Sequence, residues 1–387
     1  METTQTIQSD TSTVSDLVRR LRLIAIHSLA RMYYPAERLF AFRLRKNGRG
    51  EVLEGVSRRY TAIALIGLAG EDHQIAAEVL GEHRPEEVCM RLLEEVEEME
   101  DLGEVALTTW AARALGHPKA SMAVKALRRM EPAQRPYPTV ELSWALTALV
   151  TDGSDAVDMV LARRIAEALI ASFRQESGLF PSARARQGLS RFGAHVSCFA
   201  DFVYPIQALS YYHLATGDTR AAEVACRCAE RMCQLQGPQG QWWWHYDSRT
   251  GQVVERYPVY SVHQHAMAPM ALSALTRACG PDHSASIEKS LRWLVSPPEK
   301  TGSLIDGERN VIWRKVARRE PRRLVRGLQA TASWLHPRFR APAVDVFFPP
   351  ISVDYESRPY EMGWILHAWR GGALRTVAAP AVDRVRA

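Results

Sequence analysis

The sequence lacks any hydrophobic run long enough to cross a membrane, because no stretch approaches the ~18 consecutive apolar residues that such a helix needs. Its first fifteen residues, METTQTIQSDTSTVS, lack the basic start and the apolar core of a secretion signal. We therefore expect a cytoplasmic protein that does not insert into a membrane. Strict alternation of apolar and polar residues, the pattern of a half-buried strand, is also scarce.

Cysteine is scarce, and its spacing does not indicate a metal site. Three of the six cysteines, Cys226, Cys228 and Cys233, lie in VACRCAERMCQ, a stretch that is typical of a helix and has no second Cys/His pair at zinc-ligand spacing. We expect these residues to be reduced thiols in the core, and we expect neither a metal nor a cofactor.

The sequence contains no recognisable nucleic-acid-binding module, although its net charge is +6. Part of the positive charge lies in RKVARREPRRLVR, from Arg314 to Arg326. A run of this kind is usually the solvated face of a helix. We expect no nucleic-acid partner and only a weak preference for anionic ligands.

Helical periodicity dominates the 387 residues, of which 47% are hydrophobic. In DAVDMVLARRIAEALIASFRQ, after a possible cap at Asp155, apolar residues recur at steps of three and four, as in an amphipathic helix. RPEEVCMRLLEEVEEME shows the same spacing, with Pro85 suited to a first helical turn. The sequence predicts an all-α domain over residues 14–375, between a flexible tail, 1–13, and a basic tail, 376–387.

Six apolar helices each end near a glycine, a residue that readily adopts the left-handed conformation that terminates helices. At least one further helix separates consecutive members of the set. This alternation predicts an (α/α)6 toroid with six inner and about six outer helices. The six terminating glycines are Gly70, Gly116, Gly153, Gly217, Gly280 and Gly371.

A second set of glycines indicates an internal repeat. Gly178, Gly240 and Gly302 follow one another at equal intervals of 62 residues, each after a predicted helix. The loops beyond the first two, roughly residues 179–200 and 243–261, are longer than the usual connection of ~4–6 residues. Long loops in compact domains are often functional.

The motif at one of these glycines resembles that of a known superfamily. In QGPQGQW, Gln236, Gly240 and Trp242 are similar to the Gln-x-x-x-Gly-x-Trp repeat of the squalene-hopene cyclases, and the resemblance extends over about residues 155–310. It implies an α/α toroid. The Asp-x-Asp-Asp acid of those cyclases does not occur, and the Asp/Cys/His zinc set of the related prenyltransferases cannot be assembled.

Carbohydrate-active enzymes form another large class on this fold. DGERNVIWR, from Asp306 to Arg314, and ESRPYEMGW, from Glu356 to Trp364, resemble segments of bacterial toroid proteins of polysaccharide metabolism. The aromatic and acidic stretch from Gln239 to Leu272 is also similar to that class. The resemblance implies a glycan lying across the mouth of the ring.

Inner helices of a toroid begin at one mouth, so polar side chains of their first turns converge there. This rule selects candidate ligand-binding residues at the starts of the inner helices and in the loop before the fifth. They are Arg58, Arg59, Tyr60, Glu141, Trp144, Asp201, Tyr204, Tyr257, Tyr260, His263, His265, Arg358, Tyr360 and Glu361. Trp243 and Trp244 are further candidates, because an exposed indole could stack on the apolar face of a sugar.

Hydrolysis of a glycosidic bond needs a pair of carboxylates, one on each side of the bond. Asp201, among aromatic residues that would raise its pKa, is the predicted acid, and Asp247, Glu255 or Glu141 the predicted partner. The alternative for Asp201 is a helix cap.

Proton abstraction from a uronic acid needs a base and a cation instead. Tyr257, Tyr260, His263 and His265 are the candidate bases, and Arg256 and Arg358 the candidate cations. Because the two histidines are two residues apart, they cannot both face the pore from one helix, and one of them is expected to be structural.

Each of these residues also has a purely structural interpretation. Trp242, Trp243 and Trp244 cannot share one face, so at least one is expected to project into the cleft while another packs in the core. Arg358 has an ion pair with Glu361 as its alternative. The sequence thus favours a hydrolase, lyase or epimerase acting on a polysaccharide or oligosaccharide, possibly anionic. A terpenoid-cyclase-like enzyme and a non-catalytic scaffold that binds a glycan or a protein remain as alternatives.

Overall fold

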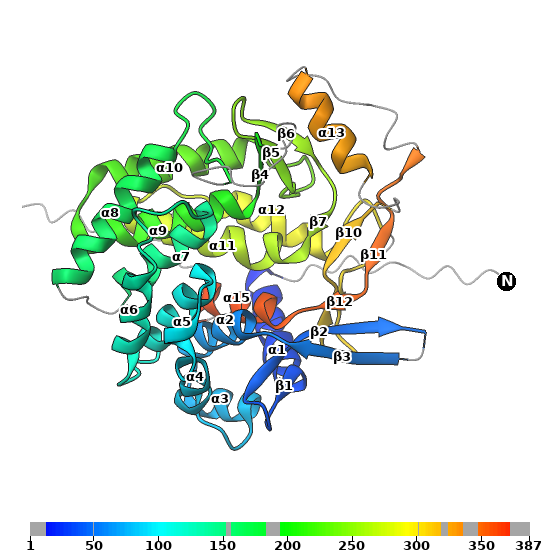
Figure 1. Cartoon of the computed structure of the whole chain (residues 1–387). Helices are drawn as coiled ribbons and strands as arrows, with labels where there is room; N and C mark the ends of the chain where they lie inside the picture. The colour runs from blue at the N-terminus through cyan, green and yellow to red at the C-terminus, as the bar shows by residue number, and fades with distance from the viewer. Residues whose placement is uncertain are drawn as a thin grey trace, which may run out of the picture.

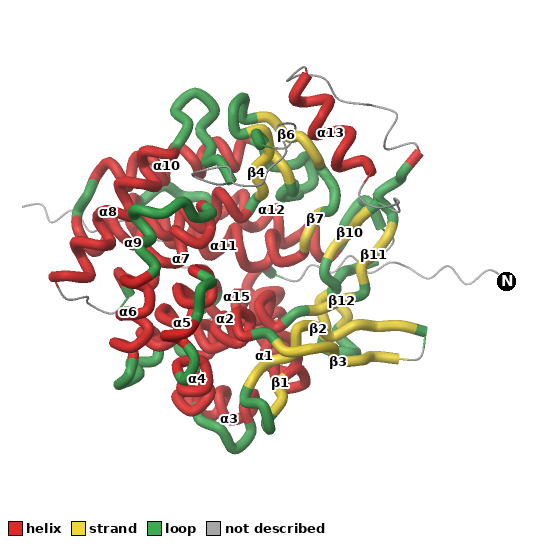
Figure 2. Tube along the Cα trace, viewed as in Figure 1, coloured by secondary structure: helices red, strands yellow, loops and turns green. Residues whose placement is uncertain are grey.

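Six helices of the computed structural model form a closed inner ring (Figures 1 and 2). The structure describes residues 13–48, 50–151, 156–182, 194–300, 302–318, 324–335 and 347–371. Each helix of the ring contacts the next, and the last packs against the first. In chain order the ring consists of α2 (Arg58–Leu68), α5 (Leu102–Ala114), α7 (Thr139–Val150), α9 (Ala200–Thr216), α11 (Ala268–Cys279) and α15 (Pro359–Ala368).

A second set of helices covers the ring and confirms the predicted α/α toroid. These outer helices are α1 (Val14–Met32), α4 (Pro85–Leu93), α6 (Ala120–Arg129), α8 (Ala156–Ser172), α10 (Thr219–Gln234) and α12 (Ser284–Val295). The short α3 (His73–Leu80) packs beside α1, and α13 (Leu324–Leu335) lies outside against strand β6. A 3-10 turn, Val96–Glu98, follows α4, so the helix predicted from Pro85 ends earlier than its apolar spacing suggested.

The turn between α9 and α10 illustrates how the sequence sets helix ends. Gly217 adopts the left-handed conformation after α9, and its N–H donates to the carbonyl of His213. The next residue, Asp218, caps α10 by accepting the backbone N–H groups of Arg220 and Ala221. Two adjacent residues therefore end one helix and begin the next, and the chain turns from the inner to the outer ring.

The predicted helix-ending glycines are only partly of this kind. Gly116, Gly217, Gly280 and Gly371 have positive φ angles, as expected. Gly70 does not, and a Cβ on it would meet the side chain of Arg370 at 2.3 Å. Gly153 lies outside the described residues, as do Asp155, residues 1–12 and residues 376–387 of the predicted tails.

The repeat glycines have a tighter steric reason. Gly178, Gly240 and Gly302 all have positive φ angles. At Gly240, a Cβ would lie 2.1 Å from the carbonyl oxygen of Lys289 on α12. The backbone after α10 thus approaches the next outer helix so closely that a side chain is excluded.

Two glycines allow α2 and α15 to approach each other closely within the inner ring. A Cβ on Gly67 would lie 2.4 Å from the carbonyl oxygen of Gly363, and a Cβ on Gly363 would lie 2.6 Å from that of Ile63. Real Cβ atoms do not approach backbone oxygens this closely, so glycine is required on both helices. This contact closes the ring between its first and last members.

Short antiparallel strands, which the sequence did not reveal, surround one end of the ring. Most are too short to show a periodic pattern. One sheet contains β1 (Tyr33–Tyr34), β2 (Leu39–Asn47), β3 (Gly50–Val56) and β12 (Glu356–Ser357), and another contains β7 (Val259–Tyr260), β10 (Lys315–Ala317) and β11 (Ser352–Asp354). A third contains β4 (Val196–Cys198), β5 (His245–Asp247) and β6 (Gln252–Glu255), and β8 (Ile305–Asp306) pairs with β9 (Val311–Ile312).

These strands hold the leading ends of the inner helices. Strands β3, β4 and β12 directly precede α2, α9 and α15, and β7 precedes the π-helical turn His263–Met267 that leads into α11. Hydrogen bonds between strands therefore fix where four inner helices begin, and for α9, α11 and α15 the pairing strand comes from a distant part of the chain.

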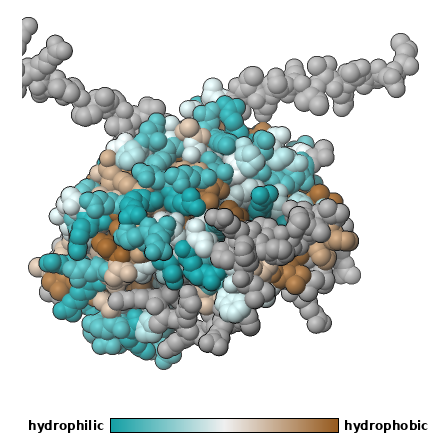
Figure 3. Space-filling model, turned by 90° about the horizontal axis from the view of Figure 1, so that it is seen from above, coloured by the Kyte–Doolittle hydropathy of each residue, from teal (hydrophilic) through white to brown (hydrophobic). Residues whose placement is uncertain are grey.

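No helix in the part of the chain that the structure describes combines the length and the apolar composition that crossing a bilayer would need. In the space-filling view, hydrophilic residues cover most of the visible face and hydrophobic residues form separate patches among them (Figure 3).

Candidate functional site

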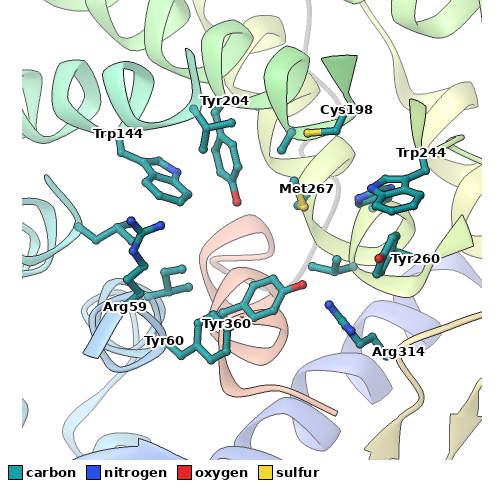
Figure 4. A pocket seen from close by; sticks show the side chains of 16 residues that line it. Arg59, Tyr60, Trp144, Cys198, Tyr204, Trp244, Tyr260, Met267, Arg314 and Tyr360 are labelled. Atoms are coloured by element: carbon teal, nitrogen blue, oxygen red, sulfur yellow. The ribbon is translucent and has the colours of Figure 1, made fainter. Parts of the chain in front are cut away.

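A cavity of about 360 Å³ opens at the mouth where the inner helices begin (Figure 4). Its size suits a small ligand or one to two sugar units. Aromatic, basic and apolar side chains of all six inner helices, or of the segments that lead into them, line it. The lining residues are Arg59, Tyr60, Ile63, Leu107, Val140, Trp144, Cys198, Ala200, Tyr204, Trp244, Tyr260, Val262, His263, Met267, Arg314 and Tyr360.

The cavity brings together eight of the residues selected from the sequence. All but Trp244 were selected by the rule that inner helices begin at one mouth. The eight are Arg59, Tyr60, Trp144, Tyr204, Trp244, Tyr260, His263 and Tyr360.

Arg59 and Trp144 form one end of the cavity. The guanidinium carbon of Arg59 lies 5.9 Å from the centroid of the Trp144 ring, a cation–π arrangement. Ion pairs with Asp101 and, at 3.2 Å, with Glu141 hold the guanidinium in place. Burial raises the pKa of Glu141, although Arg59 opposes the shift. Glu141 therefore contacts Arg59 and is not itself part of the lining.

Room for the Arg59 guanidinium depends on a glycine in the first turn of α5. A Cβ on Gly103 would lie 2.8 Å from Nη2 and 2.9 Å from Cζ of Arg59. The glycine has ordinary helical geometry, so its small size, rather than its backbone freedom, is what the site uses.

Arg314 and Tyr260 form the other end. The guanidinium carbon of Arg314 lies 5.1 Å from the centroid of the Tyr260 ring, and Nζ of Lys315 lies 5.2 Å from it. Pairing of β10 with β7 sets this contact, because Lys315 is opposite Tyr260 in the register. Sequence reasoning missed Arg314, and the interpretation of its basic run as a solvated helix face is wrong here: Arg314 is largely buried.

A cluster of carboxylates and arginines supports Arg314 from behind. Glu356 accepts hydrogen bonds from Arg314 (3.1 Å), Arg43 (2.8 Å) and Arg358 (2.8 Å). Arg358 also donates to the hydroxyl of Tyr60 at 2.8 Å. The predicted alternative for Arg358, an ion pair with Glu361, is therefore replaced by a pair with Glu356, and Arg358 reaches the cavity only through Tyr60.

Glu361 is fully buried next to this cluster. Its Oε1 lies 3.7 Å from Nε of Arg314. Burial raises the pKa of Glu361 to about 8, against the attraction of Arg314 and Arg358. At neutral pH the side chain is therefore mainly an uncharged acid behind the cavity wall, which leaves the charge of Arg314 less compensated.

Two phenols point into the cavity from α9 and α15 (Figure 4). Burial raises the pKa of Tyr204, while the indole groups of Trp364 and Trp144 act in the opposite direction. Burial also raises the pKa of Tyr360 well above its ordinary value. Both hydroxyls are consequently proton and hydrogen-bond donors at neutral pH.

The two predicted histidines face different surroundings. His263 lines the cavity, whereas His265 is enclosed in the core, where its carbonyl oxygen accepts the indole N–H of Trp369 at 2.6 Å. Burial lowers the pKa of each ring to about 3, so both imidazoles are neutral at physiological pH.

Asp201 lies behind the cavity wall. Its side chain is 1% exposed, and its carboxylate accepts the backbone N–H of Cys198 at 2.8 Å. Burial raises the pKa of Asp201 to about 6, although the hydrogen bond from Cys198 opposes the shift. The raised pKa agrees with the sequence-based expectation, but Cys198, rather than Asp201, faces the ligand space.

The other predicted carboxylates lie in separate polar contacts of the β4–β5–β6 region. Asp247 is fully buried and forms an ion pair with Arg249 at 2.8 Å. Burial opposes its ionisation, but Arg249 outweighs burial and holds the pKa below its ordinary value. Glu255 forms a buried ion pair with Arg318, the second arginine of the basic run that is not solvated. Neither carboxylate is part of the cavity lining.

The tryptophan triplet divides between core and cavity. Trp242 is buried against Phe199, and Trp243 packs against Tyr257 with the guanidinium of Arg256 over its ring. Tyr257 donates to Glu299 at 2.8 Å. Trp244 alone of the three lines the cavity, with Tyr260 edge-on to its ring.

The cysteines of VACRCAERMCQ lie on the outer helix α10, away from the cavity. Cys228 is buried, and Cys226 and Cys233 are partly buried; all three are free thiols. Among the described residues, no three His, Cys, Asp or Glu side chains lie together as a metal site would require.

Comparison with known proteins identifies the fold but no family. No family model and no curated protein sequence matches the chain. An unsaturated glucuronyl hydrolase specific for heparin is similar in structure, with a TM-score of 0.59 and 12% identity over 92% of this chain and 95% of that one. A sugar epimerase from a ruminal bacterium is also similar, with a TM-score of 0.59 and 9% identity over 94% of this chain and 100% of that one.

A third similar structure is a possible member of the GH105 family from Salmonella enterica serovar Paratyphi A, with a TM-score of 0.55 and 10% identity over 93% of this chain and 94% of that one. These similarities extend over nearly the whole chain and confirm the α/α toroid. At such low identity they establish the fold and leave the chemistry to be argued from the cavity.

Proposed function

We propose that this chain is a carbohydrate-active enzyme that removes the proton next to the carboxylate of a uronic acid unit, as a lyase or an epimerase does. One observation carries the proposal: Arg314 and Tyr260 lie against each other at one end of a cavity that also contains protonated phenols. This is the combination of cation, base and acid that such a reaction needs.

The uronate carboxylate would bind Arg314. Nη1 of Arg314 is bonded to Glu356, and the guanidinium forms the floor of this end of the cavity beside Tyr360. Removal of the proton at C5 turns the carboxylate into an enolate that carries additional negative charge. A fixed guanidinium stabilises this charge more than it stabilises the ground state, which is the condition for catalysis.

Tyr260, in its deprotonated form, would act as the base. The C5–H bond breaks, its proton goes to the Tyr260 oxygen, and its electron pair enters the enolate. In an elimination, the C4–O bond then breaks, and the departing oxygen takes a proton from Tyr360. In an epimerisation, C5 takes a proton on its opposite face instead. The neutral imidazole of His263 would hydrogen-bond the sugar without adding charge.

Aromatic rings in the lining suit the apolar face of a sugar. Trp244 stands beside Tyr260, and Trp144 and Tyr60 lie toward the Arg59 end. A pyranose presents C–H groups on one face and hydroxyls on its rim, so rings and polar groups around one space match its surface. The fold is shared with a glucuronyl hydrolase and a sugar epimerase, which supports a sugar as the ligand.

Two-carboxylate hydrolysis has less support. Asp201, Asp247, Glu255 and Glu141 were the candidate carboxylates, and all four contact protein groups behind or away from the cavity lining. A terpenoid-cyclase activity would demand a largely apolar pocket, whereas Arg59 and Arg314 both line this one.

The test is incubation in D2O with polymers of glucuronate, galacturonate, mannuronate and guluronate, with neutral polysaccharides as controls. We expect deuterium at C5 of at least one uronate and none in the neutral sugars. Absorbance of unsaturated uronate would identify elimination, and an inverted C5 would identify epimerisation. New reducing ends without either signal would indicate hydrolysis and contradict the proposal, and a ligand that binds without any exchange would favour the scaffold.

A further inference from the structure

Cys198 is the one thiol among the described residues that line the cavity, and its backbone N–H donates to the buried carboxylate of Asp201. Figure 4 shows its sulfur on the same wall as Tyr204, while Tyr360 and Arg314 lie on the facing wall. The two walls come from different parts of the fold. Cys198 ends β4, which leads into α9, and α9 lies across the ring from α2. Tyr260 belongs to β7, and Arg314 directly precedes β10, the strand that pairs with β7.

A further observation indicates that this space holds a polar ligand. His263 is 6% exposed and lines the cavity, and its Nδ1 has no hydrogen-bond partner among the described residues. Buried polar atoms are rarely left unpaired, so a ligand or water is expected to supply the missing partner.

We propose, resting on the proposed function, that Cys198 is a second proton donor to the cavity and that the enzyme inverts C5 of its uronate, with Tyr260 and Cys198 serving opposite faces of the sugar. Asp201 is the positioning residue for this thiol. Its carboxylate accepts the Cys198 backbone N–H at 2.8 Å and lies next to the thiol.

The proton balance is complete without a cofactor. Tyr260 takes the proton from C5, and the electron pair of the C–H bond enters the enolate held by Arg314. The S–H bond of Cys198 then breaks, and its proton forms the new C–H bond on the face turned toward α9. The thiolate regains a proton from Asp201 or from water, and Tyr260 releases its proton to water.

The neighbourhood of Cys198 keeps the thiol protonated until it is needed. Burial and the adjacent Asp201 carboxylate raise the pKa of Cys198 well above its ordinary value. A thiol with a raised pKa is a poor nucleophile but still a far stronger acid than the C5–H group of a uronate, so it can protonate the enolate carbon. Cys198 is therefore suited to donating a proton and unsuited to forming a covalent intermediate.

The test compares wild type with Cys198→Ala in D2O, using polymannuronate and polyguluronate, whose units differ at C5. Wild type is expected to form the inverted unit with deuterium at C5. In Cys198→Ala, inversion is expected to fall by at least ~100-fold, whereas exchange of the C5 proton without inversion continues. Cys198→Ser, which retains a weaker donor of similar size, is expected to recover part of the inversion.

Cys228→Ala is the matched control, because this buried thiol lies on α10 outside the cavity. It is expected to invert C5 at the wild-type rate. For Asp201→Asn the informative measurement is the pH profile of inversion: the wild-type rate is expected to change with the ionisation of Asp201, and the variant profile is expected to be flat in that range. A variant that merely loosened the fold would lower the rate at every pH.

Three results separate the two proposals. Inversion by Cys198→Ala at the wild-type rate would overturn the role of Cys198 and leave the proposed function standing. A wild-type reaction that yields only unsaturated product would also overturn the role of Cys198 and leave the proposed function standing. Absence of C5 exchange in wild type with every uronate polymer would overturn both.

Discussion

Two regions of the inner ring differ in what fills them: the body, where the helices pack against one another, is apolar, and the mouth, where the helices begin, is polar. In the body, α2 and α15 meet at Gly67 and Gly363, and small and aliphatic side chains fill the space between helices. At the mouth, the same helices present arginines, phenols and indoles around a cavity, and buried polar atoms such as Nδ1 of His263 lack partners in the described structure. Packing in the body holds the ring closed, whereas the mouth retains polar groups that a ligand or water would satisfy.

Gly67→Ala should destabilise the packing of the ring body and have little direct effect on the side chains at the mouth. The new Cβ would lie 2.4 Å from the carbonyl oxygen of Gly363, and neither backbone can move without opening the ring. We expect a loss of about 3 kcal/mol in the free energy of unfolding, the upper end of the usual cost of overpacking, because overpacking against backbone cannot be relieved by rotamer changes. Thermal or denaturant unfolding measures it.

Gly327→Ala in α13 is the control for this change. No atom lies within 4 Å of the Cβ that would be added there. Alanine favours helix over glycine by about 1 kcal/mol, so we expect a small gain in local stability or none. If both alanine variants changed stability equally, the contact between α2 and α15 would not be what holds the ring.

Arg314→Met changes the mouth and should affect activity far more than stability, the reverse of Gly67→Ala. We expect about a 100-fold loss of activity on a uronate substrate, the typical cost of removing a group that stabilises a developing negative charge. The change in unfolding free energy should be small, because Glu356 keeps its bonds to Arg43 and Arg358.

Lys315→Met is the matched control, since this lysine also approaches the Tyr260 ring but pairs with Asp354 and does not line the cavity. Its effect on activity should be several-fold at most. Equal losses of activity in the two variants would mean that activity depends on the total positive charge near Tyr260 and not on the position of Arg314.

The body could be predicted from the sequence and much of the mouth could not. Helix period and terminating glycines are local signals, and they located all six inner helices. The start of each inner helix also identified Tyr204, Tyr260 and Tyr360 as cavity residues, because the geometry of a toroid carries their side chains to one mouth.

Arg314 and Cys198 escaped sequence reasoning because non-local pairing places them. Arg314 reaches Tyr260 through the β10–β7 register, and Cys198 is fixed by the pairing of β4 with β5. Non-local contacts also explain why the predicted carboxylates do not line the cavity. Asp247 and Glu255 look available in the sequence, but Arg249 and Arg318 neutralise them, and the partner of Glu255 is 63 residues away.

Glu361→Gln tests whether a buried acid behind the mouth makes the stability of the protein depend on pH. Burial raises the pKa of Glu361 from an ordinary value of 4.5 to about 8, so the folded protein keeps a proton that the unfolded chain releases between these values. The stabilisation is complete below about pH 4.5 and is lost as the pH rises through about 8.

Glutamine cannot ionise, so the variant should gain stability relative to wild type as the pH rises. We expect a relative gain of about 1 to 3 kcal/mol between about pH 5 and pH 9, reduced from the full linkage value because Arg314 and Arg358 stabilise the ionised form. Denaturant unfolding across that range measures the difference. Parallel stability curves for the two proteins would contradict a buried, protonated Glu361.

Gly103→Ala gives the smallest expected effect and separates body from mouth within one helix. The added Cβ would meet only the end of the Arg59 side chain, which can rotate away, whereas at Gly67 it would meet backbone. Stability should therefore hold or rise slightly, because alanine favours the helix. The displaced guanidinium should weaken binding of a uronate oligosaccharide about 3- to 10-fold, measured by calorimetry. In an Arg59→Ala background the same methyl group should have no effect on binding, since a double-mutant cycle reports only the coupling between the two positions. An equal loss of binding in both backgrounds would show that Gly103 acts on α5 itself and not through Arg59.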